Sequence, residues 1–125
     1  MEINISDFSE VQREALLDLL VLSMYLDRHL GSGEDERVKR LLVAMGCETP
    51  YDRQRQFDAA VTRVRQYAES HDVARARAAK LGRVFTRREQ CRQVCALLED
   101  LVSCDGDVTP DEKRFLDELR DAFQV

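Results

Sequence analysis

The sequence predicts an all-α fold, a compact single-domain bundle of about six to eight helices over residues 1–125. The chain has only five Gly, two Pro and no Trp, and it is rich in Leu, Ala, Arg, Glu and Asp, a composition that favours helix over sheet. Apolar residues recur at helical spacing, and the 34% of charged residues suits helices with solvated outer faces. A chain of 125 residues has the size of one domain and can bury a core without disulfides or a structural metal.

The first two predicted helices differ in how much of their surface is apolar. The first spans residues 9–30, and its stretch 15–26 is apolar on nearly every side, which predicts a central, buried helix that ends at the Gly-containing turn 31–33. The second spans residues 34–45 and has one apolar face, and Gly46 is a typical C-terminal stop. The apolar face of the second helix consists of Val38, Leu41, Leu42 and Met45.

A polar break at residues 70–72 separates the third and fourth predicted helices. Thr49 provides an N-cap and Pro50 the first position of the third helix, which continues to about Glu69. The inner stripe of this helix consists of Phe57, Val61, Val64 and Ala68. The fourth helix, residues 73–84, is rich in Ala and Arg, and we expect it to lie on the surface.

Capping signals open the last two predicted helices. Thr86 and Glu89 have the spacing of a capping box for the fifth helix, and Gly106 follows its end. Thr109 is placed to cap the sixth helix. The predicted buried stripes are Cys91, Val94, Cys95, Leu98, Leu101 and Val102 in the fifth helix, and Phe115, Leu116, Leu119 and Phe123 in the sixth.

A weak internal repeat relates the two ends of the chain. A shift of 78 positions places the first two helices on the last two, so that Asp27 falls on Asp105 and Glu34 on Glu112. Each copy reads as a helix, an acidic loop and a helix. The apolar positions that coincide are Leu19 with Leu97, Leu20 with Leu98, Met24 with Val102, Val38 with Leu116 and Leu41 with Leu119.

The second acidic loop lies in the stretch LLEDLVSCDGDVTPDEKRFLDEL, where an apolar helix ends in Asp-Gly, an aliphatic residue follows and a Glu opens the next helix. This pattern resembles the signature of the tellurite-resistance TerB-like family. The first copy, LSMYLDRHLGSGEDERVKRLL, is similar to the family's degenerate partner motif, but Arg28 stands where the second copy has Gly106. The resemblance implies an all-helical fold, a bacterial stress-response setting, and clustered acidic residues that bind a divalent cation.

Five carboxylates form the predicted metal site. The second acidic motif also resembles the later half of an EF-hand loop when Gly106 is placed at the loop's glycine. Leu101 then takes the first ligand position and offers no side-chain oxygen, so Ca²⁺ would need both loops, whereas Mg²⁺, which keeps several waters, would accept fewer protein ligands. The predicted ligands for Ca²⁺ or Mg²⁺ are Asp27, Glu34, Asp105, Asp107 and Glu112.

Helix capping alone accounts for part of the same motif. Gly106 suits a helix C-terminus, Thr109 an N-cap, and Glu112 the third position of a capping box. Capping does not explain Asp27 and Asp105, because a helix dipole disfavours a carboxylate near the C-terminus. Cation binding and capping therefore both stay open from the sequence.

Charge is distributed unevenly along the chain. Residues 1–50 carry five basic and ten acidic side chains, residues 51–93 eleven and five, and residues 94–125 three and nine, for a net charge of −5. An acidic chain with few aromatics among its arginines is not typical of nucleic-acid binding. The alternative function is therefore a protein-interaction adaptor with separated acidic and basic faces, with a protein partner such as a membrane-associated complex. The basic face would contain Arg53, Arg63, Arg65, Arg75, Arg77, Arg83, Arg87 and Arg88.

Other features of the sequence indicate a cytoplasmic, non-enzymatic protein. The N-terminus MEINISDFSE lacks the features of a secretory signal, and the apolar run 15–26 is too short to cross a bilayer. Cys91 and Cys95 lie on an apolar stripe, where free Cys packs as a small hydrophobe. The two imidazoles, His29 and His71, come with no nucleophile motif, and no Gly-rich phosphate loop is present.

Overall fold

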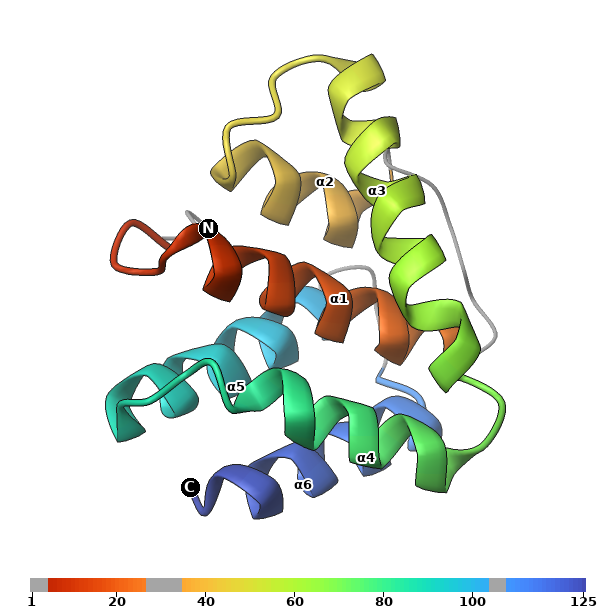
Figure 1. Ribbon diagram of the computed structural model, residues 1–125, viewed down its shortest axis with the longest axis vertical. Coiled ribbons are helices and arrows are strands. Elements are labelled where there is room, and N and C mark those ends of the chain that lie inside the picture. Colours follow the sequence, from red (N-terminus) through yellow and green to blue (C-terminus); the bar gives the residue numbers. More distant parts are fainter. Residues whose placement is uncertain (1–4, 27–34, 104–107) are drawn as a thin grey trace.

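The computed structural model describes residues 5–26, 35–103 and 108–125 (Figure 1). Within these ranges every regular element is a helix, which confirms the predicted all-α bundle of six α-helices. The helices are α1 (Glu10–Leu26), α2 (Glu36–Ala44), α3 (Pro50–Val64), the short 3-10 helix η1 (Arg65–Tyr67), α4 (His71–Gly82), α5 (Arg88–Ser103) and α6 (Pro110–Phe123).

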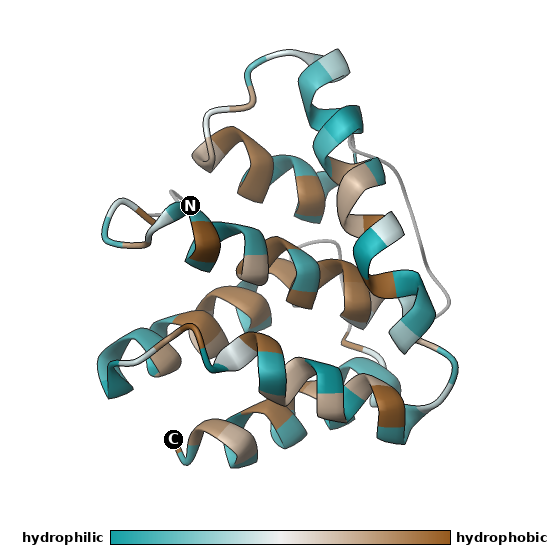
Figure 2. Ribbon diagram, in the orientation of Figure 1, coloured by the Kyte–Doolittle hydropathy of each residue, from teal (hydrophilic) through white to brown (hydrophobic). Residues whose placement is uncertain are grey.

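The centre of the bundle is α1, which packs against each of the other five α-helices. Figure 1 shows it between α2 and α3 on one side and α4, α5 and α6 on the other. Every side chain from Ala15 to Met24 is buried, including those of Asp18 and Ser23. In Figure 2 hydrophobic residues run along α1 and α2, whereas much of α3 is hydrophilic. The expectation of a central, buried helix is confirmed, and each aliphatic side chain in it stabilises the fold by about 1.5–3 kcal/mol.

Three predicted helix ends form as the sequence indicates. Gly46 follows α2 with a φ of +93°, and the amide of Cys47 donates to the carbonyl of Leu42 at 2.9 Å, which closes the helix in a Schellman turn. The side chains of Thr49 and Thr109 cap α3 and α6, and Thr109 completes the reciprocal capping box. These ends depend on residues within one turn, which is why the sequence alone predicts them.

The boundary between α3 and α4 differs from the prediction. The α-helical part of α3 ends at Val64, rather than near Glu69, because the chain tightens there into η1. The hydroxyl of Ser70 accepts a hydrogen bond from the amide of Val73, so that α4 begins at His71, two residues before the predicted start.

The start of α5 also differs. The helix begins at Arg88, and the carbonyl of Arg87 accepts a hydrogen bond from the amide of Cys91 at 3.1 Å. The N-cap position therefore falls on Arg87 rather than Thr86, and Glu89 occupies the second helical position instead of the third. The predicted capping box of Thr86 and Glu89 is therefore wrong, because α5 begins one residue later than this box requires.

The prediction that α4 lies on the surface is wrong for one of its faces. The helix packs against α1 and α6 through a face of small residues. Gly82 shows how close this packing is, because a Cβ atom there would lie 2.2 Å from Cε1 of Phe123. Propensity and hydropathy understate such contacts, since small side chains carry little apolar surface but let helices approach closely. The buried residues of α4 are Ala74, Ala78, Leu81 and Gly82.

The two copies of the internal repeat contact each other. Nε2 of Gln12 in α1 donates to Oε1 of Gln90 in α5 at 3.4 Å, and these two positions are 78 residues apart. A contact between equivalent positions is expected when two units are related by an approximate two-fold axis. The equivalent pairs buried at both positions are Leu20 and Leu98, Met24 and Val102, Val38 and Leu116, and Leu41 and Leu119.

Candidate functional site

The helices that follow the two acidic loops meet around Arg37, in the first turn of α2. The guanidinium is buried, and its Nε and Nη2 each donate to a carboxylate oxygen of Asp35 at 3.1 Å. Its Nη1 lies 3.4 Å from Oε2 of Glu112, in the first turn of α6. The guanidinium of Arg37 therefore links Asp35, which follows the first acidic loop, to α6, which follows the second acidic loop.

Glu112 is only 2% exposed, and both of its carboxylate oxygens have partners. Oε1 accepts from the amide of Thr109 at 3.1 Å, while the Thr109 hydroxyl accepts from the amide of Glu112 at 3.2 Å. Oε2 faces Arg37, whose positive charge would repel a metal ion at the same oxygen. The predicted capping role of Glu112 is confirmed, and its contacts suit a residue that joins α6 to α2.

Asp35 is the second carboxylate at this junction, and sequence reasoning did not single it out. Burial opposes its ionisation, but the hydrogen bonds and the charge of Arg37 outweigh burial and lower the pKa of Asp35. The same side chain caps α2 by accepting from the amide of Arg37 at 3.0 Å. The predicted helix 34–45 included Asp35, whereas α2 begins at Glu36 with Asp35 as its N-cap. An Asp near the start of a predicted helix was the available signal for the cap, but the link to α6 depends on the tertiary fold.

The predicted ligand set is only partly represented in the structure. Glu112 belongs to the described residues, while Asp27, Glu34, Asp105 and Asp107 lie outside them. Within the described ranges, no group of three or more His, Cys, Asp and Glu side chains comes together. The cation site therefore stays a prediction from the sequence.

A second buried carboxylate, Asp18 of α1, is held by Arg63 of α3. Nε of Arg63 lies 3.1 and 3.0 Å from the two oxygens of Asp18, and Nη2 lies 2.8 Å from one of them. Burial of Asp18 outweighs the effect of Arg63 and raises the pKa of Asp18. Burial alone would lower the pKa of Arg63, but its hydrogen bond with Asp18 raises it. In the sequence an acid inside an apolar helix is the signal for such a partner, but the signal does not identify Arg63.

Three of the eight arginines expected on the basic face have partners inside the fold. Arg53 is buried and donates to backbone carbonyls of the turn before α3, and Arg63 binds Asp18. Arg77 stacks on Tyr67, with its Cζ 4.4 Å from the ring centroid. Because these three arginines are engaged, fewer arginines remain to form the basic face that the sequence predicted. The arginines of this set that are exposed are Arg65, Arg75, Arg83, Arg87 and Arg88.

The described cysteines are poor nucleophiles. Cys91 and Cys95 are buried in α5, as the apolar stripe predicted, and the thiol of Cys91 donates to the carbonyl of Phe85 at 3.4 Å. Burial raises the pKa of both thiols, that of Cys95 to about 11, and it also raises the pKa of Cys47. Protonated thiols bind soft metals and react with electrophiles weakly. Cys104 lies outside the described residues.

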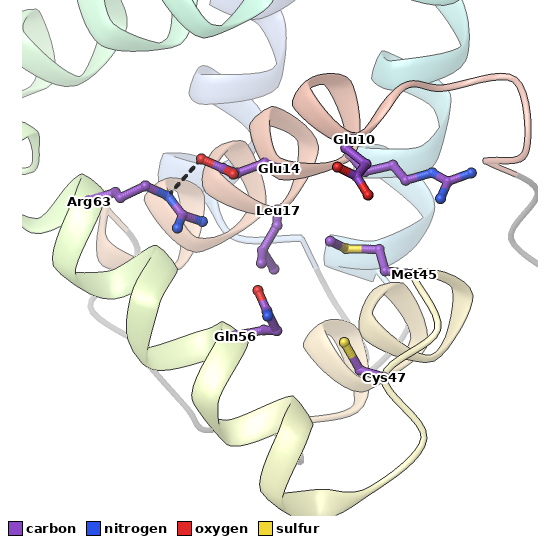
Figure 3. Close-up of a pocket in the computed structure, with 8 residues that line it drawn as sticks. Glu10, Glu14, Leu17, Met45, Cys47, Gln56 and Arg63 are labelled. Carbon is purple, nitrogen blue, oxygen red and sulfur yellow. Dashed lines mark ion pairs between the residues drawn. The ribbon is translucent and has the colours of Figure 1, made fainter.

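An open cleft of about 300 Å³ lies between α1, α3 and the turn after α2 (Figure 3). Figure 3 shows the side chains of Leu17, Met45 and Gln56 directed into this space, with Cys47 at its edge. Nothing in the sequence singles out this cleft, because three separate segments form it. The lining residues are Glu10, Arg13, Glu14, Leu17, Met45, Cys47, Gln56 and Arg63.

Comparisons with protein-family models, with curated proteins and with solved structures find no match to this chain. The resemblance to the TerB-like family therefore rests on the motif quoted from the sequence. No helix in the described part of the chain combines the length and the apolar character needed to cross a bilayer.

Proposed function

We propose that this chain is a non-enzymatic module in which the two acidic loops together bind a divalent cation, Ca²⁺ or Mg²⁺. The supporting observation is the Arg37 bridge. Asp35 directly follows residues 27–34, and Glu112 opens the helix after residues 104–107, so one guanidinium ties together the chain segments that follow both loops. A cation shared by two loops needs such proximity, because its ligand oxygens must lie within about 2.0–2.6 Å of the ion.

The contacts of Glu112 change its place in the proposed site. Asp27, Glu34, Asp105 and Asp107 supply the ligand oxygens, and Glu112 acts as a positioning residue because both of its oxygens are engaged. Carboxylates are the hard oxygen ligands that Ca²⁺ and Mg²⁺ prefer. Waters complete the coordination shell, which favours Mg²⁺ when few protein oxygens are available.

The family resemblance supports a wider setting for the same proposal. A TerB-like motif suggests a cytoplasmic role in a bacterial stress response that resembles tellurite resistance. The alternative, an adaptor that uses an acidic and a basic face without metal, has weaker support, since Arg53, Arg63 and Arg77 are engaged within the fold.

Thermal unfolding of chelator-treated protein, with Ca²⁺, Mg²⁺, Mn²⁺ or Zn²⁺ added back, tests the cation proposal. An ion at about 100 times its Kd stabilises the folded state by about 2.7 kcal/mol, which raises the Tm of a domain of this size by roughly 10 °C. The variant Asp27→Asn/Asp105→Asn should lose this rise. The matched control Asp100→Asn/Asp117→Asn, which changes two exposed acids of α5 and α6, should keep it.

The design leaves Glu112 unchanged, because its substitution would also break a helix cap and an ion pair. A Tm that does not rise with any ion, or that rises equally in the loop variant and the control, would refute the cation site. The acidic motif would then serve capping and surface charge, and salt-sensitive binding of protein partners would become the property to measure.

A further inference from the structure

We infer that the cleft between α1, α3 and the turn after α2 docks a basic, partly apolar segment of a partner protein. One aliphatic side chain of that segment would lie on the floor of the cleft, with a Lys or Arg beside it at the rim. The inference does not depend on the cation proposal, because every residue that lines the cleft lies outside both acidic loops.

The floor of the cleft is apolar and adaptable. Leu17 lines the cleft but is fully buried, so the accessible apolar surface belongs to Met45 and Cys47, which are half-buried. Methionine has three rotatable bonds and a polarizable sulfur, so it fits apolar groups of different shape. The volume of about 300 Å³ is at the lower limit for ligand pockets, which suits one or two side chains better than a large cofactor.

The two arginines that line the cleft are committed to acceptors of the protein itself. The guanidinium of Arg63 binds the buried carboxylate of Asp18 through two nitrogens. Nε of Arg13 donates to the backbone carbonyl of Ile5 at 3.3 Å. The charge of Arg63 is therefore compensated by Asp18, whereas Arg13 keeps its positive charge at the rim of the cleft.

With Arg63 paired to Asp18, the two glutamates at the rim face a single positive charge, that of Arg13, so the rim keeps a net negative charge. Glu10 and Glu14 are exposed and lie one turn apart on α1, a spacing at which like charges repel. Glu14 lies 3.4 Å from Nε of Arg63, but that guanidinium already neutralises Asp18. No ion pair reaches Glu10 in the part of the chain that the structure describes. A cation placed between the two glutamates would relieve their repulsion, so the rim favours a basic partner.

Gln56 makes a peptide segment a better fit than a simple amine. Its side chain points from α3 toward Leu17 (Figure 3), and its amide can both donate to and accept from a peptide backbone. Carboxylates at the rim, an amide on one wall and an apolar floor together match a Lys- or Arg-flanked aliphatic residue.

Titration of the ¹⁵N-labelled full chain with capped pentapeptides tests the docking inference. The probe has a Lys-Leu-Lys core, and two matched peptides replace either both Lys with Glu or the Leu with Ser. The Lys-Leu-Lys peptide should shift the amide signals of Leu17, Cys47 and Gln56, and both replacements should weaken binding. Because exposed ion pairs are individually weak, Glu10→Gln/Glu14→Gln should weaken binding by roughly threefold or more. The control Glu69→Gln/Glu89→Gln alters two exposed glutamates that do not line the cleft, so it should bind as the wild type does.

Several results would overturn the inference. The three amide signals would not shift, or the acidic peptide would bind as tightly as the Lys-Leu-Lys peptide, or the variant Glu10→Gln/Glu14→Gln would bind the Lys-Leu-Lys peptide as tightly as the wild type does. Equal binding of the Ser-containing peptide would show that the floor is not used. Shifts at the cleft that follow protein concentration without peptide would assign the cleft to a second copy of the chain instead. Thermal unfolding of each variant separates lost binding from lost folding.

Discussion

Replacing Arg63 with Met should destabilise the protein mainly through the carboxylate that it leaves behind. Asp18 is 3% exposed as a side chain, whereas Arg63 is 31% exposed. Breaking a fully buried ion pair costs about 3–5 kcal/mol. Partial solvation of the arginine weakens the pair, and Asp18 can take up a proton, so we expect Arg63→Met to cost about 2–3 kcal/mol at pH 7.

A second substitution identifies the cause of this loss. Asp18→Asn removes the charge while keeping the shape, and it should cost under about 1 kcal/mol alone because burial already disfavours the charged form. The double variant Asp18→Asn/Arg63→Met should therefore be more stable than Arg63→Met by about 1–2 kcal/mol. Urea denaturation followed by far-UV circular dichroism measures all four proteins. A double variant less stable than Arg63→Met would refute the reasoning and attribute the loss to packing or to Glu14.

The pH dependence of the same variants has a defined sign. Burial raises the pKa of Asp18 in the folded protein above 3.8, so the folded state binds this proton more tightly than the unfolded state. The stability contributed by Asp18 is complete below pH 3.8 and is lost as the pH rises through the folded pKa. The difference in the free energy of unfolding between Arg63→Met and the double variant should therefore become smaller as the pH is lowered from 7 toward 4. A difference that becomes larger on acidification would contradict this assignment.

Three further predictions concern packing, capping and thiol chemistry. Gly82→Ala places a Cβ against the ring of Phe123, and the clash should exceed the gain in helix propensity by about 1 kcal/mol in a urea denaturation, a loss that Phe123→Leu should relieve. Thr109→Ala should lower stability by about 1 kcal/mol in the same assay, whereas Thr86→Ala, at a position outside the α5 cap, should change it by less than half of that. Cys95, whose pKa is raised to about 11, should react with a thiol-specific disulfide reagent at pH 8 only after urea is added, and rapid labelling of Cys95 in the native protein, located by peptide mapping, would contradict its burial.

Local patterns predicted most of the helices and their caps. The apolar run within residues 9–30 predicted the central α1, and the stripe from Cys91 to Val102 predicted the buried face of α5. Thr49 and Thr109 cap helices through amides within three residues, so sequence spacing suffices to find them. At the start of α5 the same reasoning failed by one residue, since Thr86 matches the motif but the helix begins at Arg88.

Contacts between residues far apart in the sequence could not be predicted from the same patterns. Arg37 and Glu112 are 75 positions apart, and Asp18 and Arg63 are 45 apart, so no period or motif links them. The Ala face of α4 was missed because small side chains carry little hydrophobic signal, although they pack closely in the bundle. The cleft was missed for a related reason, since α1, α3 and the turn after α2 contribute its residues separately.

The contacts of Arg37 and Arg63 with carboxylates orient helices and side chains more than they stabilise the fold. An apolar pair of similar shape is often as stable as a buried ion pair, so net stability alone does not account for these charges. Arg37 links the first turn of α2 to the first turn of α6 through its ion pair with Glu112, which brings together the chain segments that follow the acidic loops. Arg63 directs its charge toward Asp18 inside the bundle, so that Glu10 and Glu14 outnumber Arg13 at the mouth of the cleft. In both places the arginine pairs with two carboxylates of the protein itself, Asp35 and Glu112 for Arg37 and Asp18 and Glu14 for Arg63, so each cluster holds more acidic than basic side chains.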